Sequence, residues 1–181
     1  MMIRHAEKPV PGAVPLGVTP DGMPDEHSLT VRGWQRAGAL ATFFSPSSGQ
    51  PAYAPISRPQ FIFAASGQTV ARSVRSRQTV TPLATKLGGA ARANFEFGGG
   101  QEAEVAAAIL QCSGVVLIAW EHHNLPVIAS HFPISPGNKA PVAPWPDDRF
   151  DLVWVFDQDT DASGYLFTQA AQQLLAGDRG I

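Results

Sequence analysis

The stretch Val115-Val116-Leu117-Ile118-Ala119-Trp120 is one of the two longest apolar runs in the chain and the strongest indication of how it folds. A short, continuous apolar run of this kind is typical of a buried strand. Residues 61–65 form a second such run and residues 152–156 a third. Segments of helical periodicity separate them. This alternation predicts an α/β fold, a three-layer sandwich whose mostly parallel central sheet has helices on both faces.

The expected helices are marked by caps and by apolar spacing. Thr30 is a good N-cap, and apolar residues follow it at three- and four-residue intervals as far as Phe44. A second helix is predicted from about Arg72 to Leu87 and should stop at Gly88-Gly89, with a kink or an interruption at Pro82. The remaining predictions are helices over residues 101–111 and 125–131, and short strands near residues 95–97 and 165–167.

Composition restricts the class of protein. The chain of 181 residues fits a single domain, residues 1–181, and its 44% apolar and 15% charged content is that of a folded globule. A net charge of −2 without a basic run argues against a nucleic-acid partner. Cys112 is the only cysteine, which excludes an intrachain disulfide, and we expect it to be an inert, partly buried thiol.

The chain shows no sign of a membrane segment or a leader. The run at residues 115–120 is much too short to span a bilayer, and the amino terminus does not resemble a signal peptide. We therefore expect a soluble, cytoplasmic protein without a membrane partner. Only Met1, Met2 and Ile3 precede Arg4, so either the first strand is very short or the sequence starts too late, in which case a leader could have been lost.

Candidate functional residues follow the ends of the predicted strands. His5 follows the first strand, Ser66 and nearby arginines follow the second, and Glu121-His122 follow the third. Ligand groups of open α/β sheets gather at the carboxyl ends of strands, so we expect these residues to meet at one edge. The pair Arg4-His5 suits an anion such as phosphate, because the guanidinium holds oxygens while the imidazole attacks phosphorus.

Four short motifs stand out along the chain: Arg4-His5-Ala6-Glu7, Leu29-Thr30-Val31-Arg32-Gly33 with Ala37, Arg75-Ser76-Arg77-Gln78-Thr79 with Pro82-Leu83-Ala84, and Glu121-His122 after the apolar strand. Taken together, they resemble the histidine phosphatase superfamily, which includes phosphoglycerate mutases and histidine acid phosphatases. The chain is similar to small bacterial members over about residues 3–130, and more loosely over its tail at residues 145–151. Ala6 stands where many members have glycine.

This resemblance implies a phosphatase that hydrolyses phosphomonoesters through a phosphohistidine, without metal or cofactor. His5 would be the nucleophile, while Arg4, Arg75 and His122 would surround the phosphate and stabilise the transition state. Arg77 competes with Arg75 for the phosphate, although the spacing to Gln78-Thr79 favours Arg75. Ser73 could replace Ser66 as the serine that precedes the arginine.

The proton donor is less constrained by the resemblance. Glu121 is the first choice, since some members carry a carboxylate next to the second histidine, and Glu7, Glu102 and Asp25 are alternatives. His123 and His131 are interpreted as a neighbour and a surface residue, and a metal site built from His122, His123 and His131 is not expected. The expected partner is a small phosphorylated substrate or phosphate itself; the substrate's identity and the oligomeric state stay open.

Two other functions compete with the phosphatase. A catalytically inactive phosphate-binding or regulatory domain of the same fold would keep the cations but lack turnover. A mutase is the weaker option, because the chain is short for the usual insertions around a sugar phosphate.

Overall fold

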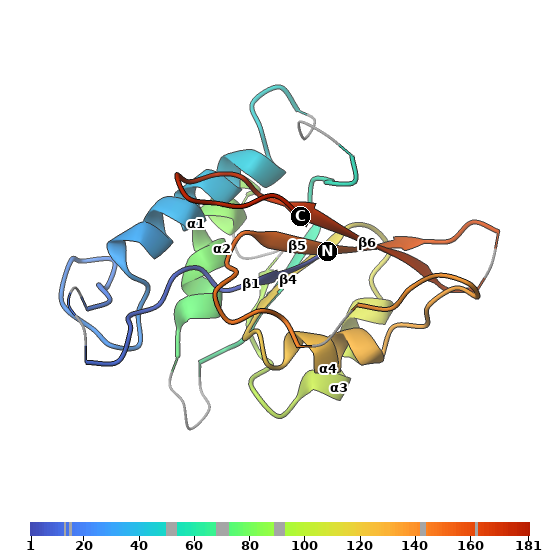
Figure 1. The fold of residues 1–181 in the computed structure, drawn as a ribbon, viewed down its shortest axis with the longest axis horizontal. Helices are drawn as coiled ribbons and strands as arrows, with labels where there is room; N and C mark the ends of the chain where they lie inside the picture. Colours follow the sequence, from blue (N-terminus) through green and yellow to red (C-terminus); the bar gives the residue numbers. More distant parts are fainter. Residues whose placement is uncertain are drawn as a thin grey trace.

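A six-stranded mixed sheet forms the centre of the computed structural model (Figure 1). The structure describes residues 1–12, 14, 16–49, 54–67, 73–88, 93–141, 144–161 and 163–181. The strand order is β3-β2-β4-β1-β5-β6. The strands are β1 (Met2–Arg4), β2 (Phe61–Ala64), β3 (Ala93–Asn94), β4 (Val116–Trp120), β5 (Leu152–Gln158) and β6 (Tyr165–Ala171).

The α/β prediction is confirmed, and the sheet is mostly but not purely parallel. Strand β4 runs parallel to both β1 and β2, and β2 runs parallel to β3. Strand β5 is antiparallel to β1 and to β6. The strands that carry the candidate residues thus belong to the parallel part, and their carboxyl ends share one edge.

Alternate residues of the strands enter two separate hydrophobic clusters. Ile3 and Leu117 pack with α1 (Val31–Phe44) and α2 (Arg75–Lys86), whereas Met2 and Ile118 pack with α3 (Glu102–Leu110) and α4 (Leu125–Ser130). Figure 1 accordingly shows α1 and α2 on one side of the strands and α3 and α4 on the other. Successive strand side chains point to opposite faces, so the continuous apolar runs supply both clusters. No helix in the described part of the chain is long and apolar enough to cross a membrane.

Helix boundaries largely follow the local signals. Thr30 caps α1 as predicted, because its side chain accepts a hydrogen bond from the Gly33 N–H. Of the kink or interruption predicted at Pro82, the interruption is wrong, because α2 runs through this residue, and Val80 and Leu83 pack into the core. Strand β3 lies slightly before the predicted residues 95–97. The predicted starting residue Arg72 and the stop residue Gly89 lie outside the described residues.

Candidate functional site

His5 and Glu121 lie side by side because they follow neighbouring parallel strands. The pairing of β1 with β4 sets Arg4 opposite Trp120, and the His5 N–H donates to the Trp120 carbonyl at 3.0 Å. Both strands end at this point. The next residue on each strand is therefore a candidate site residue at the carboxyl edge, as the sequence predicts.

The imidazole of His5 is buried and neutral at pH 7. Only 4% of the residue is exposed, and its Nδ1 lies 2.8 Å from the Ala6 carbonyl oxygen. A carbonyl can only accept, so Nδ1 carries the proton and Nε2 keeps its lone pair. Burial lowers the pKa of His5 to about 3, and the charges of Arg4, Arg75 and Lys8 act in the same direction. These features leave Nε2 unprotonated, with its lone pair available.

Contacts with α2 hold the segment that carries His5. The Ala6 N–H donates to Thr79 Oγ1 at 2.8 Å, and that hydroxyl donates to the Arg75 carbonyl. Gln78 accepts from the Leu29 N–H at 2.9 Å and donates to Ser28 Oγ at 2.8 Å. Gln78 and Thr79 are thus positioning residues that connect α2 to the two loops around His5.

Gly33 allows α1 to approach the same segment closely. A Cβ added at Gly33 would lie 2.5 Å from the Glu7 carbonyl oxygen, which is far inside van der Waals contact. The Thr30 N–H also donates to this carbonyl at 3.0 Å. The motif that runs from Leu29 to Gly33 therefore fixes the first turn of α1 against the residues just after His5.

Arg75 faces the same cavity as His5 and Glu121. This cavity of about 200 Å³ is also lined by Lys8 and Ser73. The Arg75 guanidinium donates to neutral oxygens: the Ser28 carbonyl at 3.3 Å, Ser73 Oγ at 3.4 Å and the Glu26 carbonyl. Burial lowers its pKa, yet it stays a cation at pH 7.

Arg77, the alternative to Arg75, lies elsewhere. Its side chain is exposed, and its guanidinium lies over the ring of Phe95, 5.2 Å from the ring centroid. Of the two arginines, the structure brings only Arg75 to the cavity that contains His5.

Arg4 and His122 line a neighbouring cavity instead. This cavity, of about 370 Å³, shares Lys8 with the first and also contains Asp147 and Phe150. Arg4 donates to the Asp147 carbonyl and lies over the Phe150 ring, 3.8 Å from its centroid. Nε2 of His122 is 2.9 Å from Asp147 Oδ1. The five predicted residues thus line two cavities that share Lys8. His5, Arg75 and Glu121 line one, and Arg4 and His122, which both contact Asp147, line the other.

Burial leaves both Arg4 and His122 incompletely paired. Arg4 Nε and His122 Nδ1 have no hydrogen-bond partner among the described residues. Burial lowers the pKa of Arg4 to about 10, and burial, with the nearby Arg4 and His123, also lowers that of His122. Buried polar atoms without a partner are costly, and a bound ligand or ion is one explanation for them.

Of the four candidate proton donors, Glu121 alone lines the cavity that contains His5. Glu7 pairs with the buried Arg36 at 2.8 Å, and Asp25 accepts from Ser28 and from the His27 N–H. Glu102 accepts from Asn124 at 2.7 Å and from Trp120 at 3.4 Å. The three alternatives are therefore occupied by internal contacts.

Sequence reasoning did not assign Lys8 or Asp147 to the site. Lys8 is exposed and lines both cavities, and it stands only three positions after His5. Asp147 lies in the loop before β5, far along the chain from the other candidate residues. The closeness of Lys8 to Arg4-His5 in the sequence could have assigned it to the site, whereas no local pattern assigned Asp147 to it.

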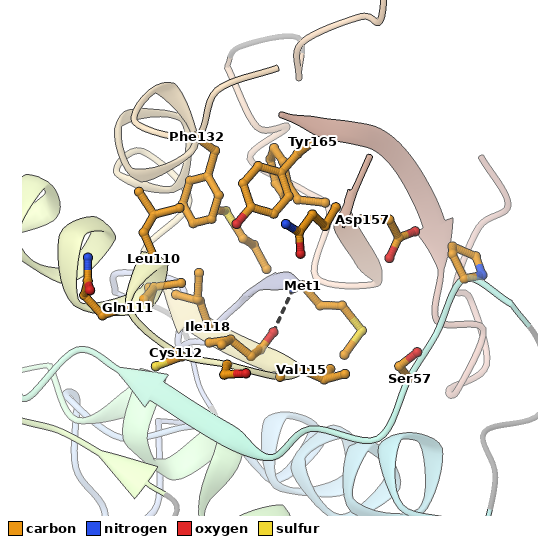
Figure 2. A pocket seen from close by; sticks show the side chains of 18 residues that line it. Met1, Ser57, Leu110, Gln111, Cys112, Val115, Ile118, Phe132, Asp157 and Tyr165 are labelled. Carbon is orange, nitrogen blue, oxygen red and sulfur yellow. Dashed lines mark hydrogen bonds between the residues drawn. The ribbon is translucent and has the colours of Figure 1, made fainter. Parts of the chain in front are cut away.

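A larger cavity lies at the opposite edge of the sheet, at the amino ends of β1 and β4 (Figure 2). It measures about 520 Å³, and its wall includes Phe132, Tyr165, Asp157 and Cys112. The Met1 amino group, which donates to the Val116 carbonyl at 2.8 Å, also borders it. Burial raises the pKa of Cys112, so the thiol is a poor nucleophile. The candidate catalytic residues therefore lie at the carboxyl ends of the strands, although the larger cavity lies at the amino ends.

No protein-family model matches the sequence, and no curated protein matches it significantly. The fold and the site by themselves define an α/β protein with a buried neutral histidine and several cations at the carboxyl edge of a mixed sheet.

Proposed function

We propose that the protein is a histidine phosphatase that hydrolyses small phosphomonoesters through a phosphohistidine on His5. The observation that carries the proposal is the shared cavity of His5, Arg75 and Glu121, in which the His5 imidazole is neutral. A nucleophile, a permanent cation and a carboxyl group that transfers protons are groups that a phosphohistidine mechanism can use. A three-layer sandwich fold and a cytoplasmic location belong to the same proposal.

In the first step, the Nε2 lone pair of His5 attacks phosphorus as the bond to the leaving oxygen breaks. Glu121 donates a proton to that oxygen, and the alcohol departs. Arg75 and Lys8 stabilise the charge on the equatorial oxygens. The product is a phosphohistidine with Nδ1–H still bonded to the Ala6 carbonyl.

In the second step, water attacks the phosphohistidine. Glu121, now a carboxylate, takes a proton from the water as the N–P bond breaks, which restores neutral His5 and releases inorganic phosphate. A neutral His122 can donate its Nε2–H to the phosphate only if the Asp147 carboxylate leaves that nitrogen, whereas Arg4 contacts the backbone carbonyl of Asp147 and not its side chain. Movement of the Asp147 side chain, which is 81% exposed, is therefore part of the proposed cycle.

Hydrolysis of para-nitrophenyl phosphate by the wild-type chain and His5→Ala tests the proposal. His131→Ala is the matched control, because His131 is an exposed histidine at the end of α4. We expect chelator-resistant turnover that His5→Ala abolishes and His131→Ala preserves. Turnover that survives His5→Ala would contradict the mechanism. Tungstate or phosphate binding without turnover, in folded wild type, would instead support the inactive binding domain.

A further inference from the structure

The turn after β4 brings three metal-binding side chains together. One potential ligand atom from each of Glu121, His122 and His123 lies within 4.8 Å of the other two. From these contacts we propose that Glu121, His122 and His123 form a binding site for a transition-metal ion of the Zn²⁺ type. This set differs from the three histidines considered in the sequence analysis, because Glu121 takes the place of His131.

His122 is already oriented as a metal-binding histidine. Its Nε2 lies 2.9 Å from Asp147 Oδ1, and a carboxylate partner places the ring proton on Nε2. Nδ1 then carries the lone pair, and this buried atom has no partner among the described residues. Histidines that bind metals usually donate their other N–H to a carboxylate in this way. Asp147 would therefore be the positioning residue of the site.

The other two donors can complete the site with small movements. Donors at about 2.0–2.1 Å from a tetrahedral ion are about 3.4 Å apart, so the present separations need to shorten. Glu121 and His123 are exposed, and the ring of His123 lies 3.8 Å from that of His122 with a tilt of 37°. Rotation of exposed side chains costs little, while His122 stays fixed.

The donor set selects the kind of ion. Two imidazoles and one carboxylate suit Zn²⁺, Co²⁺, Ni²⁺ or Cu²⁺, whereas Mg²⁺ and Ca²⁺ prefer oxygen ligands alone. Three protein ligands leave a tetrahedral ion one open position for water or an anion. Because the cavities on both sides are lined by members of this trio, that position is accessible to small molecules.

Metal binding would also regulate the phosphatase, a consequence that rests on the proposed function. A bound ion would occupy Glu121 and His122, the proposed proton donor and one of the phosphate ligands. We therefore expect Zn²⁺ to inhibit turnover and chelator to restore it. The binding itself requires no activity, so it can be tested whether or not the chain is a phosphatase.

Calorimetric titration of the full chain with Zn²⁺ alone, together with Co²⁺ absorption spectra, tests the site. We expect one ion per chain, a Kd at least tenfold higher for His123→Ala, and an unchanged Kd for the matched control His131→Ala. Asp147→Asn should weaken binding by about 10–100-fold while the Co²⁺ band of a tetrahedral site persists. Absence of binding, or equal losses in both histidine variants, would overturn the proposal.

The activity assay separates failure of the two proposals. Zn²⁺ binding without any turnover would leave the metal site supported and the phosphatase contradicted. Turnover that depends on His5 but is insensitive to Zn²⁺, with no Co²⁺ band, would leave the phosphatase supported and overturn the metal site.

Discussion

Arg4 and Arg36 are both completely buried, with exposures of 1% and 2%, but their surroundings differ. Arg36 is held by two carboxylates, with Glu7 Oε1 at 2.8 Å and Asp178 Oδ1 at 2.7 Å from Nη2. Arg4 donates to backbone carbonyls and lies over Phe150, and its Nε is unpaired among the described residues. One buried arginine is neutralised within the fold, and the other is not.

The electrostatics of the two arginines follow from this difference. Burial alone would lower the pKa of Arg36, but its bonds to Asp178 and Glu7 outweigh that and raise it. For Arg4, burial dominates and lowers the pKa to about 10. A buried cation without a carboxylate partner destabilises the fold. An anion that pairs with it removes much of this penalty, which favours anion binding. Both arginines are buried, so the presence or absence of carboxylate partners is what distinguishes the structural Arg36 from Arg4, a candidate for binding an anion.

The largest expected effect is on stability, in Arg36→Met. This substitution leaves Glu7 and Asp178 buried without their cation, and breaking such a pair costs about 3–5 kcal/mol. Urea denaturation measures the free energy of unfolding. Arg32→Met is the matched control, because Arg32 also contacts Glu7 but its side chain is 46% exposed, and we expect a loss below about 1 kcal/mol. Equal losses in the two variants would remove the distinction between the arginines.

The second effect is on activity, in Arg4→Met. If the phosphatase proposal holds, loss of this cation lowers kcat/KM for an aryl phosphate by about 10²–10³-fold, as for other preorganised charges. The free energy of unfolding should stay within about 1 kcal/mol of the wild type or rise, because an unpaired buried charge is removed. A stability loss comparable to that of Arg36→Met, with kcat/KM unchanged, would assign Arg4 to the fold instead.

The third effect is a pH dependence centred on Asp178. Burial tends to raise its pKa, but hydrogen bonds from Arg36 and from the Leu174 and Leu175 N–H groups lower it to about 2, below its ordinary value of 3.8. Its contribution, about 2 kcal/mol for such a shift, is complete above about pH 5 and is lost as the pH falls through the folded pKa. Urea denaturation between pH 6 and pH 2 checks this.

Asp178→Asn is the control for that titration. The variant should be less stable at pH 6, because Arg36 loses one of its carboxylates, and its stability should vary less with pH over the acid range. A wild-type profile that Asp178→Asn leaves unchanged in shape would show that other carboxylates govern the acid limb.

Local sequence signals predicted the helices and strands, whereas the direction of the strands in the sheet depends on long-range pairing. The apolar runs predicted β2, β4 and β5, and the Thr30 cap predicted the start of α1, because each depends on neighbouring residues alone. The antiparallel direction of β5 and β6 depends on which strand each meets in space. No local pattern carries that information.

The same reasoning applies to the candidate site. The carboxyl-edge rule predicted that His5 and Glu121 would meet, and Arg75 joins them in one cavity. The contact of Asp147 with His122 joins a loop to residues 25 positions away, and Arg36 meets Asp178 across 142 positions. Such pairs depend on the assembled fold. The catalytic roles of the five residues stay predictions until they are measured.

The smallest expected effect is that of Thr30→Ala, which separates support of the loop from catalysis. Thr30 Oγ1 accepts from the Gly33 N–H at 3.1 Å and donates to the Glu7 carbonyl at 3.2 Å. Loss of an N-cap costs about 1 kcal/mol, so urea denaturation should show a loss of that size. Thr30→Ser keeps the hydroxyl and should recover most of it. Because the cap contacts the Glu7 carbonyl and not Arg4, phosphate affinity should change less than in Arg4→Met. An equal change would mean that the Glu7 loop itself controls the anion site.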